Sequence, residues 1–422
     1  MNFIHGKRHI RINLLYNMSM VKVRLWAFIL SVIIVGSVGT LVSLYARGYR
    51  FDFKALKFQP NGILVIKSEP DGASVFVDGD LKTATNATIS LSPGTYDVEV
   101  RRDGFFTWYK RLTIEKEVVT QANVSLFRNV PSLSPVTFSG AVNPTISLDG
   151  GKIAYSVLPG VGTSDDKIGL WTLDTFSLPL GFSNDPKRIT DGDLTNTSYA
   201  FSPDGRQIML TTSNGIFVLD AGSFKPQNQR VNIASQKLET IRQWQKEKSA
   251  KDISLIRNLP AELTDILTRK SSDFVFSPDQ NMILYTASSA GVLTDKLIKP
   301  LPGASTQREE RTIQTGHTYI YDIKEDRNFL VYDQAVNLSD KIPDIKNMVP
   351  AIRWMSTSRH LLLAQPGQIV IMDYDGTNRE VVYSGSYIST FAFPFNNTTR
   401  LLILTNLGGI NTSANLYTLT IK

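Results

Sequence analysis

One uncharged, apolar stretch constrains this chain more than any other feature. It runs from Trp26 to Tyr45, and no charged residue occurs from Leu25 through Ala46. A helix needs about 20 consecutive apolar residues to cross the hydrocarbon core of a bilayer. The stretch meets that length, so we predict a transmembrane helix at Trp26–Tyr45 in contact with the lipid bilayer. A buried core helix is the alternative, although one this long without a polar face is unusual.

The charge distribution predicts how this helix is oriented. The chain has 45 Lys and Arg residues, 38 Asp and Glu residues and a net charge of +7. Five basic residues and no acidic ones precede the apolar stretch, namely Lys7, Arg8, Arg11, Lys22 and Arg24. Positive flanks stay on the cytoplasmic side, so we expect the N-terminus inside and the bulk of the chain outside the cytoplasmic membrane. The remaining 40 basic residues nearly balance the 38 acidic ones, so we expect no nucleic-acid partner.

We interpret the apolar stretch as an uncleaved signal anchor. The apolar region of a cleaved signal peptide is about 7–15 residues long, and small residues precede the cut. Here the stretch is longer and ends in Leu44-Tyr45-Ala46-Arg47, which is a poor cleavage site. This predicts a basic cytoplasmic tail over 1–25, an anchor over 26–45 and a juxtamembrane linker over 46–61.

Residues 62–127 have the pattern of a small β unit. Tyr96, Val98 and Val100 alternate with charged residues, which is the period of a half-buried strand. We expect strands at 63–66, 74–77, 96–101, 112–114 and 118–126. The residues expected to shape the turns between them are Pro70, Asp71, Gly72, Ala73, Asp78, Gly79, Pro93, Gly94 and Gly104.

The order of these turns resembles a PEGA domain. The Pro-Glu-Gly-Ala motif that names the family appears here as Pro70-Asp71-Gly72-Ala73. Thr85-Asn86 stands where the family often has Thr-Pro, which affects one loop. The resemblance implies a small β-sandwich of surface and envelope proteins, without catalysis. We therefore interpret the turn residues as structural.

A repeated turn organises residues 128–422. Phe201-Ser202-Pro203-Asp204-Gly205 precedes an apolar stretch, and Phe276-Ser277-Pro278-Asp279 precedes another. Ser-Pro-Asp-Gly suits a type I turn. A second motif, an apolar run that usually ends in Asp, follows at 169–174, 215–220, 318–322, 368–373 and 415–419. Uninterrupted copies recur about every 45 to 50 residues, which is typical of propeller blades.

The paired motifs resemble a TolB-like or WD40-like β-propeller. The predicted fold class is therefore mainly β: one N-terminal transmembrane helix, a small β-sandwich over 62–127, and a β-propeller with a helical insertion over 128–422. Five repeat units are recognisable, and six or seven are expected if Pro131–Ser139 and Asn328–Val336 add strands. One insertion, 234–270, is predicted to be helical, and the other, 288–316, to be a mobile loop. These insertions form either a binding surface or a cover for a blade edge.

The sequence motifs predict no catalytic residue, no cofactor site and no metal site. The chain has no cysteine, which excludes disulfides and thiolate nucleophiles, and none of its four histidines has metal-ligand spacing. We interpret His317 and His360 as surface or edge residues. The carboxylates in 191–193 and 373–376 lack the full spaced ligand set of a calcium loop, so we interpret both stretches as turns.

Aromatic residues gather at Phe105, Phe106, Trp108 and Tyr109. Exposed rings can stack on sugars, but packing within the sandwich is the favoured interpretation. The favoured function is a membrane-anchored, extracytoplasmic, non-catalytic binding or scaffold protein of the cell envelope, with an envelope protein or glycan as partner. The arrangement resembles bacterial membrane-anchored proteins with a PEGA domain. One alternative is an envelope glycan or peptide hydrolase whose site forms only in the fold, and another is a single-pass sensor with a cytoplasmic partner.

Overall fold

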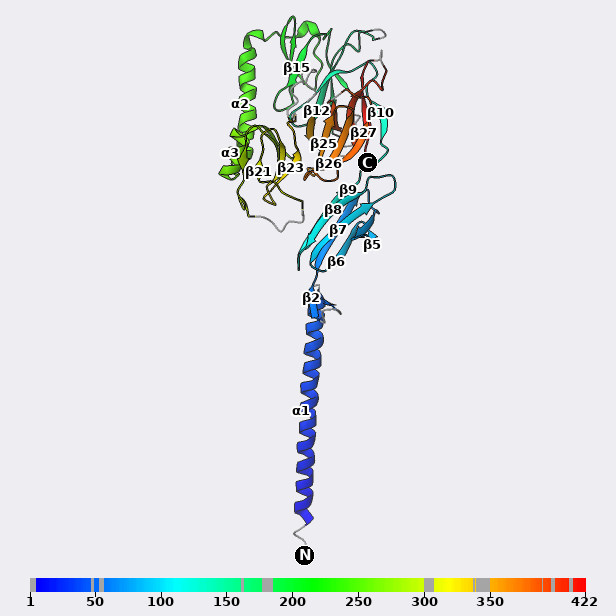
Figure 1. The fold of residues 1–422 in the computed structure, drawn as a ribbon, viewed down its shortest axis with the longest axis vertical. Coiled ribbons are helices and arrows are strands. Elements are labelled where there is room, and N and C mark those ends of the chain that lie inside the picture. Colours follow the sequence, from blue (N-terminus) through cyan, green and yellow to red (C-terminus); the bar gives the residue numbers. More distant parts are fainter. Residues whose placement is uncertain are drawn as a thin grey trace. The chain divides into compact units, whose positions relative to one another are not determined.

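The computed structural model shows a mainly β chain with one long N-terminal helix (Figure 1). It describes residues 5–46, 49–52, 57–160, 163–176, 185–299, 307–336, 338, 350–388, 390–395, 399–409 and 413–422. The chain divides into two compact units. The first comprises residues 1–67, 86–96 and 112–123, and the second comprises residues 68–85, 97–111 and 124–422.

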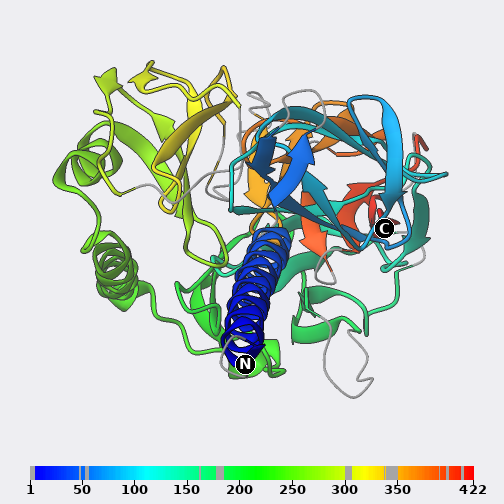
Figure 2. The ribbon, with the colours of Figure 1, turned by 90° about the horizontal axis from the view of Figure 1, so that it is seen from below.

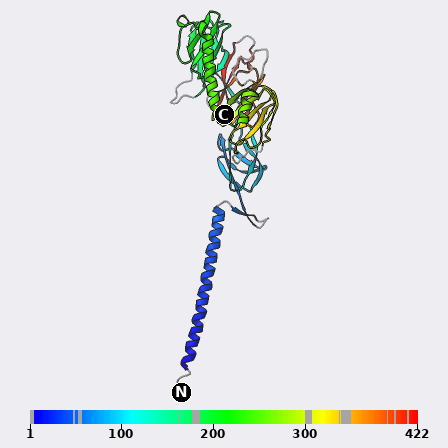
Figure 3. The same ribbon diagram turned by 90° about the vertical axis from the view of Figure 1, so that its left-hand side faces the viewer.

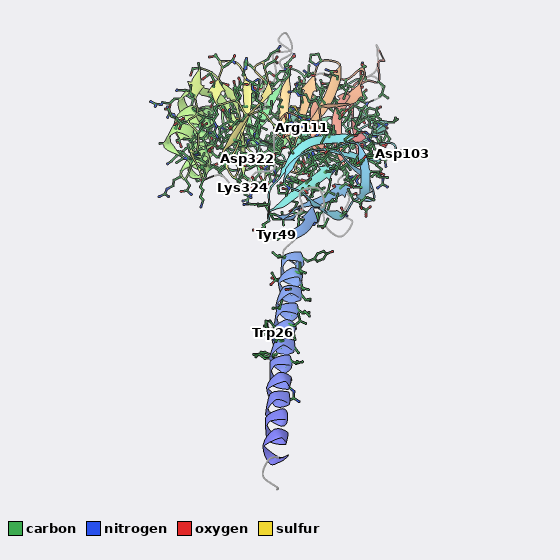
Figure 4. The ribbon with its side chains drawn as sticks, turned by 60° about the horizontal axis from the view of Figure 1, so that its bottom comes forward. Trp26, Tyr49, Asp103, Arg111, Asp322 and Lys324 are labelled. Carbon is green, nitrogen blue, oxygen red and sulfur yellow. The ribbon has the colours of Figure 1, made fainter. Side chains whose placement is uncertain are left out.

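Helix α1 (His5–Ala46) is unbroken along its whole length (Figure 3). By length and composition its segment Val23–Ala46 can cross a membrane, and none of its most apolar window is buried. Trp26 projects from the side of this helix (Figure 4). The hydroxyls of Ser31 and Thr40 each donate a hydrogen bond of 2.8 Å to a carbonyl of their own helix. The exposure of α1 contradicts the alternative of a buried core helix.

A short hairpin follows α1. Strand β1 (Tyr49–Asp52) pairs antiparallel with β2 (Lys57–Pro60). The hydroxyl of Tyr49, which Figure 4 labels, donates a hydrogen bond of 3.0 Å to Glu117 Oε1. The predicted linker therefore contains a small hairpin, while residues 47–48 and 53–56 lie outside the described residues.

Residues 62–125 form two antiparallel sheets. The first has the order β6-β3-β9 and the second the order β5-β4-β7-β8. The strands are β3 (Gly62–Glu69), β4 (Ser74–Val77), β5 (Asp80–Ala84), β6 (Ala87–Leu91), β7 (Gly94–Arg101), β8 (Trp108–Ile114) and β9 (Val119–Ser125). Strands lie at all five predicted positions, and β5 and β6 add to them. Alternate residues such as Leu64 and Ile66 of β3, and Val98 and Val100 of β7, are fully buried, which is the burial pattern of a β-sandwich.

The turn residues lie between these strands. Asp78 (φ 51°) and Gly79 (φ 83°) join β4 to β5, and two consecutive positive φ angles give the tight hairpin that Asp-Gly favours. Gly72 and Gly104 also have positive φ angles, of 70° and 81°. Pro70 and Asp71 precede β4 with the buried Ala73, and Pro93 lies before β7, which begins at Gly94.

The rest of the described chain contains five larger antiparallel sheets; four have their strands in chain order, and the fifth adds β10 beside β30. The first is β11 (Val142–Ile146), β12 (Lys152–Val157), β13 (Gly169–Asp174) and β14 (Lys187–Asp191); the second is β15 (Ser198–Phe201), β16 (Gln207–Thr212) and β17 (Gly215–Asp220). The third is β18 (Ser271–Phe276), β19 (Met282–Ala287), β22 (Thr318–Asp322) and β23 (Arg327–Tyr332); the fourth is β24 (Ala351–Trp354), β25 (His360–Gln365), β26 (Gln368–Asp373) and β27 (Glu380–Ser384). The fifth is β28 (Ala392–Phe395), β29 (Arg400–Thr405), β30 (Asn415–Thr420) and β10 (Ser132–Pro135).

The fifth sheet joins the two ends of this series. Strand β10 precedes the first sheet in the chain but pairs with β30, so that Leu133 lies opposite Leu419. Sharing a sheet between first and last strands is how a propeller closes. The expectation of six or seven units is wrong for the described residues, because β10 and β23 complete existing sheets instead of starting new ones.

Neighbouring sheets share hydrophobic cores. The core between the first and second sheets includes Leu170 and Ile208. The first sheet also shares a core with the fifth, the fifth with the fourth, and the fourth with the third. No single sheet buries both of its faces alone, which explains why the repeats need one another.

One face of the third sheet is covered by helices and not by another sheet. Helix α3 (Ala261–Arg269) packs its buried Leu263, Ile266 and Leu267 on that sheet's second face, beside Tyr285 and Tyr321. Helix α2 (Lys237–Ile256) runs between the second and third sheets (Figure 2). This helix is not a core helix along its whole length, because Leu238 in its first turn is 71% exposed. The insertion 288–316 contains the paired strands β20 (Gly291–Val292) and β21 (Thr312–Ile313), and its residues 300–306 lie outside the described residues.

The repeated turns connect the first two strands of their sheets. Ser202 Oγ donates to Asp204 Oδ1 at 2.5 Å, and Ser277 Oγ to Asp279 Oδ1 at 2.7 Å. Gly205 closes the first turn with φ 69°, and Gln280 adopts φ 60° in the second. Pro203 and Pro278 lie between the bonded pairs. The Ser-Pro-Asp residues thus shape turns and have no position in a common site.

Candidate functional site

Strand β8 carries a lysine into the interior. Its residues Trp108, Lys110, Leu112 and Ile114 are buried, and those between them are more exposed. Side chains alternate between the two faces of a strand, so Lys110 must lie on the same face as the apolar residues. The next residue, Arg111, lies on the other face and pairs with Asp97 at 2.6 Å.

The ammonium of Lys110 meets two carboxylates from the end of β26 and the turn that follows. Lys110 Nζ lies 2.6 Å from Asp375 Oδ2 and 3.8 Å from Asp373 Oδ2. The three side chains are 9%, 0% and 9% exposed, respectively. Burial works to lower the pKa of Lys110, but the two carboxylates outweigh it, so the pKa lies above its ordinary value and the side chain is charged.

Asp373 is held by uncharged donors. Its Oδ2 accepts hydrogen bonds from Trp108 Nε1 at 3.2 Å and from Asn378 Nδ2 at 2.9 Å. Burial raises the pKa of Asp373 to about 6, and the neighbouring Asp375 charge adds to the rise while Lys110 opposes it. This carboxyl therefore titrates in the range where most carboxyls are fully ionised.

Asp375 has the opposite balance. Thr377 Oγ1 donates to its Oδ1 at 2.6 Å, and Lys110 binds its Oδ2. Burial works to raise the pKa of Asp375, but the Lys110 charge and these hydrogen bonds together hold it below its ordinary value. Gly376, with φ 79°, completes the predicted turn, and its N–H donates to the Asp373 carbonyl at 3.0 Å.

His360 completes the cluster, and the prediction that it is a surface or edge residue is wrong. It begins β25, an inner strand of the fourth sheet, and is buried. Its Nε2 lies 3.5 Å from Asp373 Oδ1, its Nδ1 lies 2.9 Å from Thr357 Oγ1, and its ring meets Phe127 edge-on at 5.2 Å. Burial lowers the pKa of His360 to about 3, so the imidazole is neutral.

We call the contact of strand β8 with the fourth sheet the β8 junction; it consists of Trp108, Lys110, His360, Asp373, Asp375 and Asn378. Hydrogen bonds from backbone amides reinforce it. The amide of Tyr109 donates to Asn378 Oδ1 at 2.9 Å. The Phe106 amide donates to the Phe127 carbonyl at 2.8 Å. Trp108 is therefore a packed residue, as predicted in preference to sugar stacking. Its packing partner is the fourth sheet of the propeller and not the sandwich alone. Tyr109 remains 43% exposed.

Asp322 and Asp326, the other two buried aspartates that the structure describes, have protein partners, whereas the buried Oε2 of Glu325 accepts no hydrogen bond. Asp322, labelled in Figure 4 with Lys324, accepts the backbone N–H groups of residues 324 and 325 at 2.8 and 3.0 Å. Asp326 accepts from Tyr321 and pairs with Arg311. In the described part of the chain, no group of three or more His, Asp or Glu is suited to hold a metal. The β8 junction therefore serves to hold strand β8 on the fourth sheet.

None of the turn residues predicted in 62–127 or in the Ser-Pro-Asp repeats belongs to the β8 junction, whereas Asp373 and Asp375 of the predicted turn 373–376 do. The sequence contains one signal of the β8 junction, because Trp108, Lys110, Leu112 and Ile114 occupy alternate positions. A lysine in the apolar register of a strand indicates a buried charge, and a buried charge requires a partner. The partner itself, more than 260 residues further along the chain, has no mark beyond an acidic turn.

Comparison with known proteins supports the first part of the fold. The family model described as "PEGA domain" matches residues 61–129. No curated protein sequence matches the chain.

Several solved structures share part of the fold at low similarity. A putative TolB from Agrobacterium tumefaciens is 14% identical, with 66% of this chain and 78% of that chain covered and a TM-score of 0.21. TolB from Acinetobacter baumannii is 13% identical, with 77% and 59% covered and a TM-score of 0.19. A luciferin-regenerating enzyme is 9% identical, with 69% and 97% covered and a TM-score of 0.27. Overlap this low carries no argument, so the propeller assignment rests on the five sheets described above.

Proposed function

We propose that this chain is a single-pass protein of the bacterial cell envelope that displays its PEGA segment and propeller outside the cytoplasmic membrane as a non-catalytic binding or scaffold module. One observation carries the proposal: the apolar segment Val23–Ala46 of α1, none of whose most apolar window is buried, follows a basic segment and precedes every sheet. Lipid covers such a helix, and its basic flank remains in the cytoplasm.

The chemistry of the buried groups favours binding over catalysis. A hydrolase acting through two carboxylates needs them free to face a substrate about 5 to 10 Å apart. Asp373 and Asp375 instead hold Lys110, Trp108 and Asn378, which leaves them committed to the fold. The partner we propose is an envelope protein or glycan.

The absence of cysteine allows a direct test of topology. Asn13→Cys places one thiol in the basic tail, and Asn214→Cys places one at an exposed position between β16 and β17. In intact cells, or in spheroplasts where an outer membrane is present, a membrane-impermeant maleimide should label only the thiol at position 214. Labelling of position 13 alone would reverse the topology, and labelling of neither before lysis would place both ends inside.

Binding is tested by photo-crosslinking the full chain in its own membrane. A photoreactive residue replaces the exposed Leu238 of α2, and a matched control replaces the buried Leu263 of α3. We expect an adduct with one protein or glycan species from position 238 and none from position 263. Adducts of equal yield from both positions, or from neither, would count against a binding surface on this insertion.

The sensor alternative requires a cytoplasmic partner for the basic tail. Removing residues 2–17 keeps Lys22 and Arg24 as the inner flank. A scaffold should retain its crosslinked adduct and its phenotype after this deletion, whereas a sensor should retain the adduct and lose the phenotype.

A further inference from the structure

The β8 junction contains more negative than positive charge. Lys110 supplies one buried ammonium, Asp373 and Asp375 supply two buried carboxylates, and the imidazole of His360 is neutral. Neighbouring elements add further charges. Two cations, Arg359 and Lys422, act on His360, and two anions, Asp322 and Glu325, act on Tyr374. Lys324 and Arg327 lie beside those two anions. These outer groups do not remove the excess, because Arg359 is exposed and Lys422 pairs with Glu69 at 2.6 Å. An uncompensated buried charge is costly, so the junction favours uptake of one proton.

The geometry indicates which atoms share that proton. Asp375 remains ionised because Lys110 lies 2.6 Å from it, whereas Asp373 lies 3.8 Å from the same ammonium. The hydrogen bonds from Trp108 and Asn378 both reach Asp373 Oδ2, and Asp373 Oδ1 faces His360 Nε2 at 3.5 Å. When His360 carries its hydrogen on Nδ1 and donates it to Thr357 Oγ1, Nε2 is an acceptor. A proton on Asp373 Oδ1 therefore faces a ring nitrogen that accepts it once the 3.5 Å separation shortens to hydrogen-bond length.

We propose that the β8 junction is a proton-binding site, in which one proton from solvent is held between Asp373 Oδ1 and His360 Nε2 and strengthens the attachment of β8 to the fourth sheet. Proton uptake converts the Asp373 carboxylate into a carboxylic acid and leaves the imidazole neutral. The buried charge of Lys110, Asp373 and Asp375 then sums to zero. Attachment of β8 thus responds to mild acidity outside the membrane.

The sign of the response follows from linkage. The pKa of Asp373 is about 6 in the closed junction, against 3.8 for a solvated carboxyl. Because the closed form binds the proton more tightly, acidification stabilises it, and the gain accrues as pH falls through about 6 toward 4. Between pH 7 and pH 5 these two values give an increase of about ninefold in the closing equilibrium.

The amide of Tyr109 reports this equilibrium, since its hydrogen bond to Asn378 Oδ1 exists only when the junction is closed. Hydrogen exchange of this amide is measured by mass spectrometry with residue-level fragmentation, on the full chain in detergent micelles, at pH 5 and pH 7. Each rate is divided by the rate of the unstructured peptide at the same pH, so only opening of the junction remains. We expect about ninefold greater protection at pH 5.

Matched substitutions assign the effect. Asp373→Asn should abolish the pH dependence, whereas Asp204→Asn, in a turn of the second sheet where hydrogen bonds lower the carboxyl pKa, should leave it intact. Glu325→Gln and Asp322→Asn remove the two other carboxyls nearby whose pKa burial raises, and they should also leave it intact. Equal protection at both pH values in the wild type overturns the proposal, as does a ninefold response that survives Asp373→Asn. If Asp373→Asn does not fold, loss of the response in Glu325→Gln or Asp322→Asn overturns it instead.

Discussion

Lys110→Met is the substitution that tests the β8 junction most severely. Methionine fills a similar volume but carries no charge, so the change removes the ammonium and leaves the interior close to its present packing. The side chains of Asp375 and Asp373 are 0% and 9% exposed, which prevents water from replacing the lost cation without opening the structure. The consequence is two carboxylates without their counter-ion in a buried site.

The expected cost is about 3–5 kcal/mol of unfolding free energy, which is typical when one partner of a buried ion pair is removed. Asp373 contributes less of this cost than Asp375. Its pKa is already about 6, so it avoids the penalty by taking up a proton near neutral pH. Asp375 bonds directly to the ammonium at 2.6 Å and bears most of the loss.

The measurement is urea unfolding of the full chain in detergent micelles at pH 7, followed by tryptophan fluorescence, to which Trp108 in the junction contributes. Lys82→Met in β5 is the matched control, because Lys82 pairs with Asp80 at 3.1 Å but both side chains are exposed. Surface pairs of this kind contribute about 0–1 kcal/mol. The double variant Lys110→Met/Asp375→Leu should recover most of the lost stability, since an apolar pair can replace a buried ionic one.

Two results would refute this reasoning. A loss below about 1 kcal/mol for Lys110→Met, equal to that of the exposed pair, would mean that the junction is hydrated. A double variant as unstable as Lys110→Met alone would mean that lost packing, and not an unpaired carboxylate, causes the destabilisation.

Two further predictions concern packing and backbone. Leu263→Ala in α3 should cost about 2–5 kcal/mol in the same urea assay because this side chain is fully buried, whereas Leu238→Ala in α2, at a site 71% exposed, should change stability by about 0.5 kcal/mol or less. Gly169→Ala should destabilise the fold by more than the roughly 1–3 kcal/mol of backbone strain at φ 141°, because the new Cβ would also lie 2.0 Å from the Thr190 carbonyl oxygen. Gly316→Ala is its control: φ is 81° and no atom lies within 4 Å of the new Cβ, so only the cost of backbone strain is expected. Equal losses for the two alanines within either pair would contradict the corresponding argument.

Local patterns predicted most of the strands. Alternation along 96–101 and the Asp78-Gly79 turn depend on residues close together in the chain, and the structure has β7 and the β4–β5 connection there. The repeated Ser-Pro-Asp turns likewise satisfy their own hydrogen bonds, as Ser202 and Asp204 do. Such features are readable because their energies do not depend on the rest of the fold.

The number of sheets was not readable in this way. Residues 131–139 have strand character, and nothing local distinguishes a strand that starts a new sheet from one that completes an old one. Pairing of β10 with β30 joins residues nearly 290 positions apart, so only the tertiary arrangement of the sheets decides it. The same holds for α3, which the predicted helical insertion 234–270 includes, while its role as the cover of the third sheet was not predictable.

The sequence by itself determined the apolar N-terminal helix and the positions of the turns, because each depends on composition or on neighbours within a few residues. The tertiary structure alone decided where the buried charges meet. Lys110 lies in the apolar register of β8, and His360 looked like a surface residue. Only the fold brings Asp373 and Asp375 to that lysine, because the energy of a buried charge depends on which groups share its interior and not on their order in the chain.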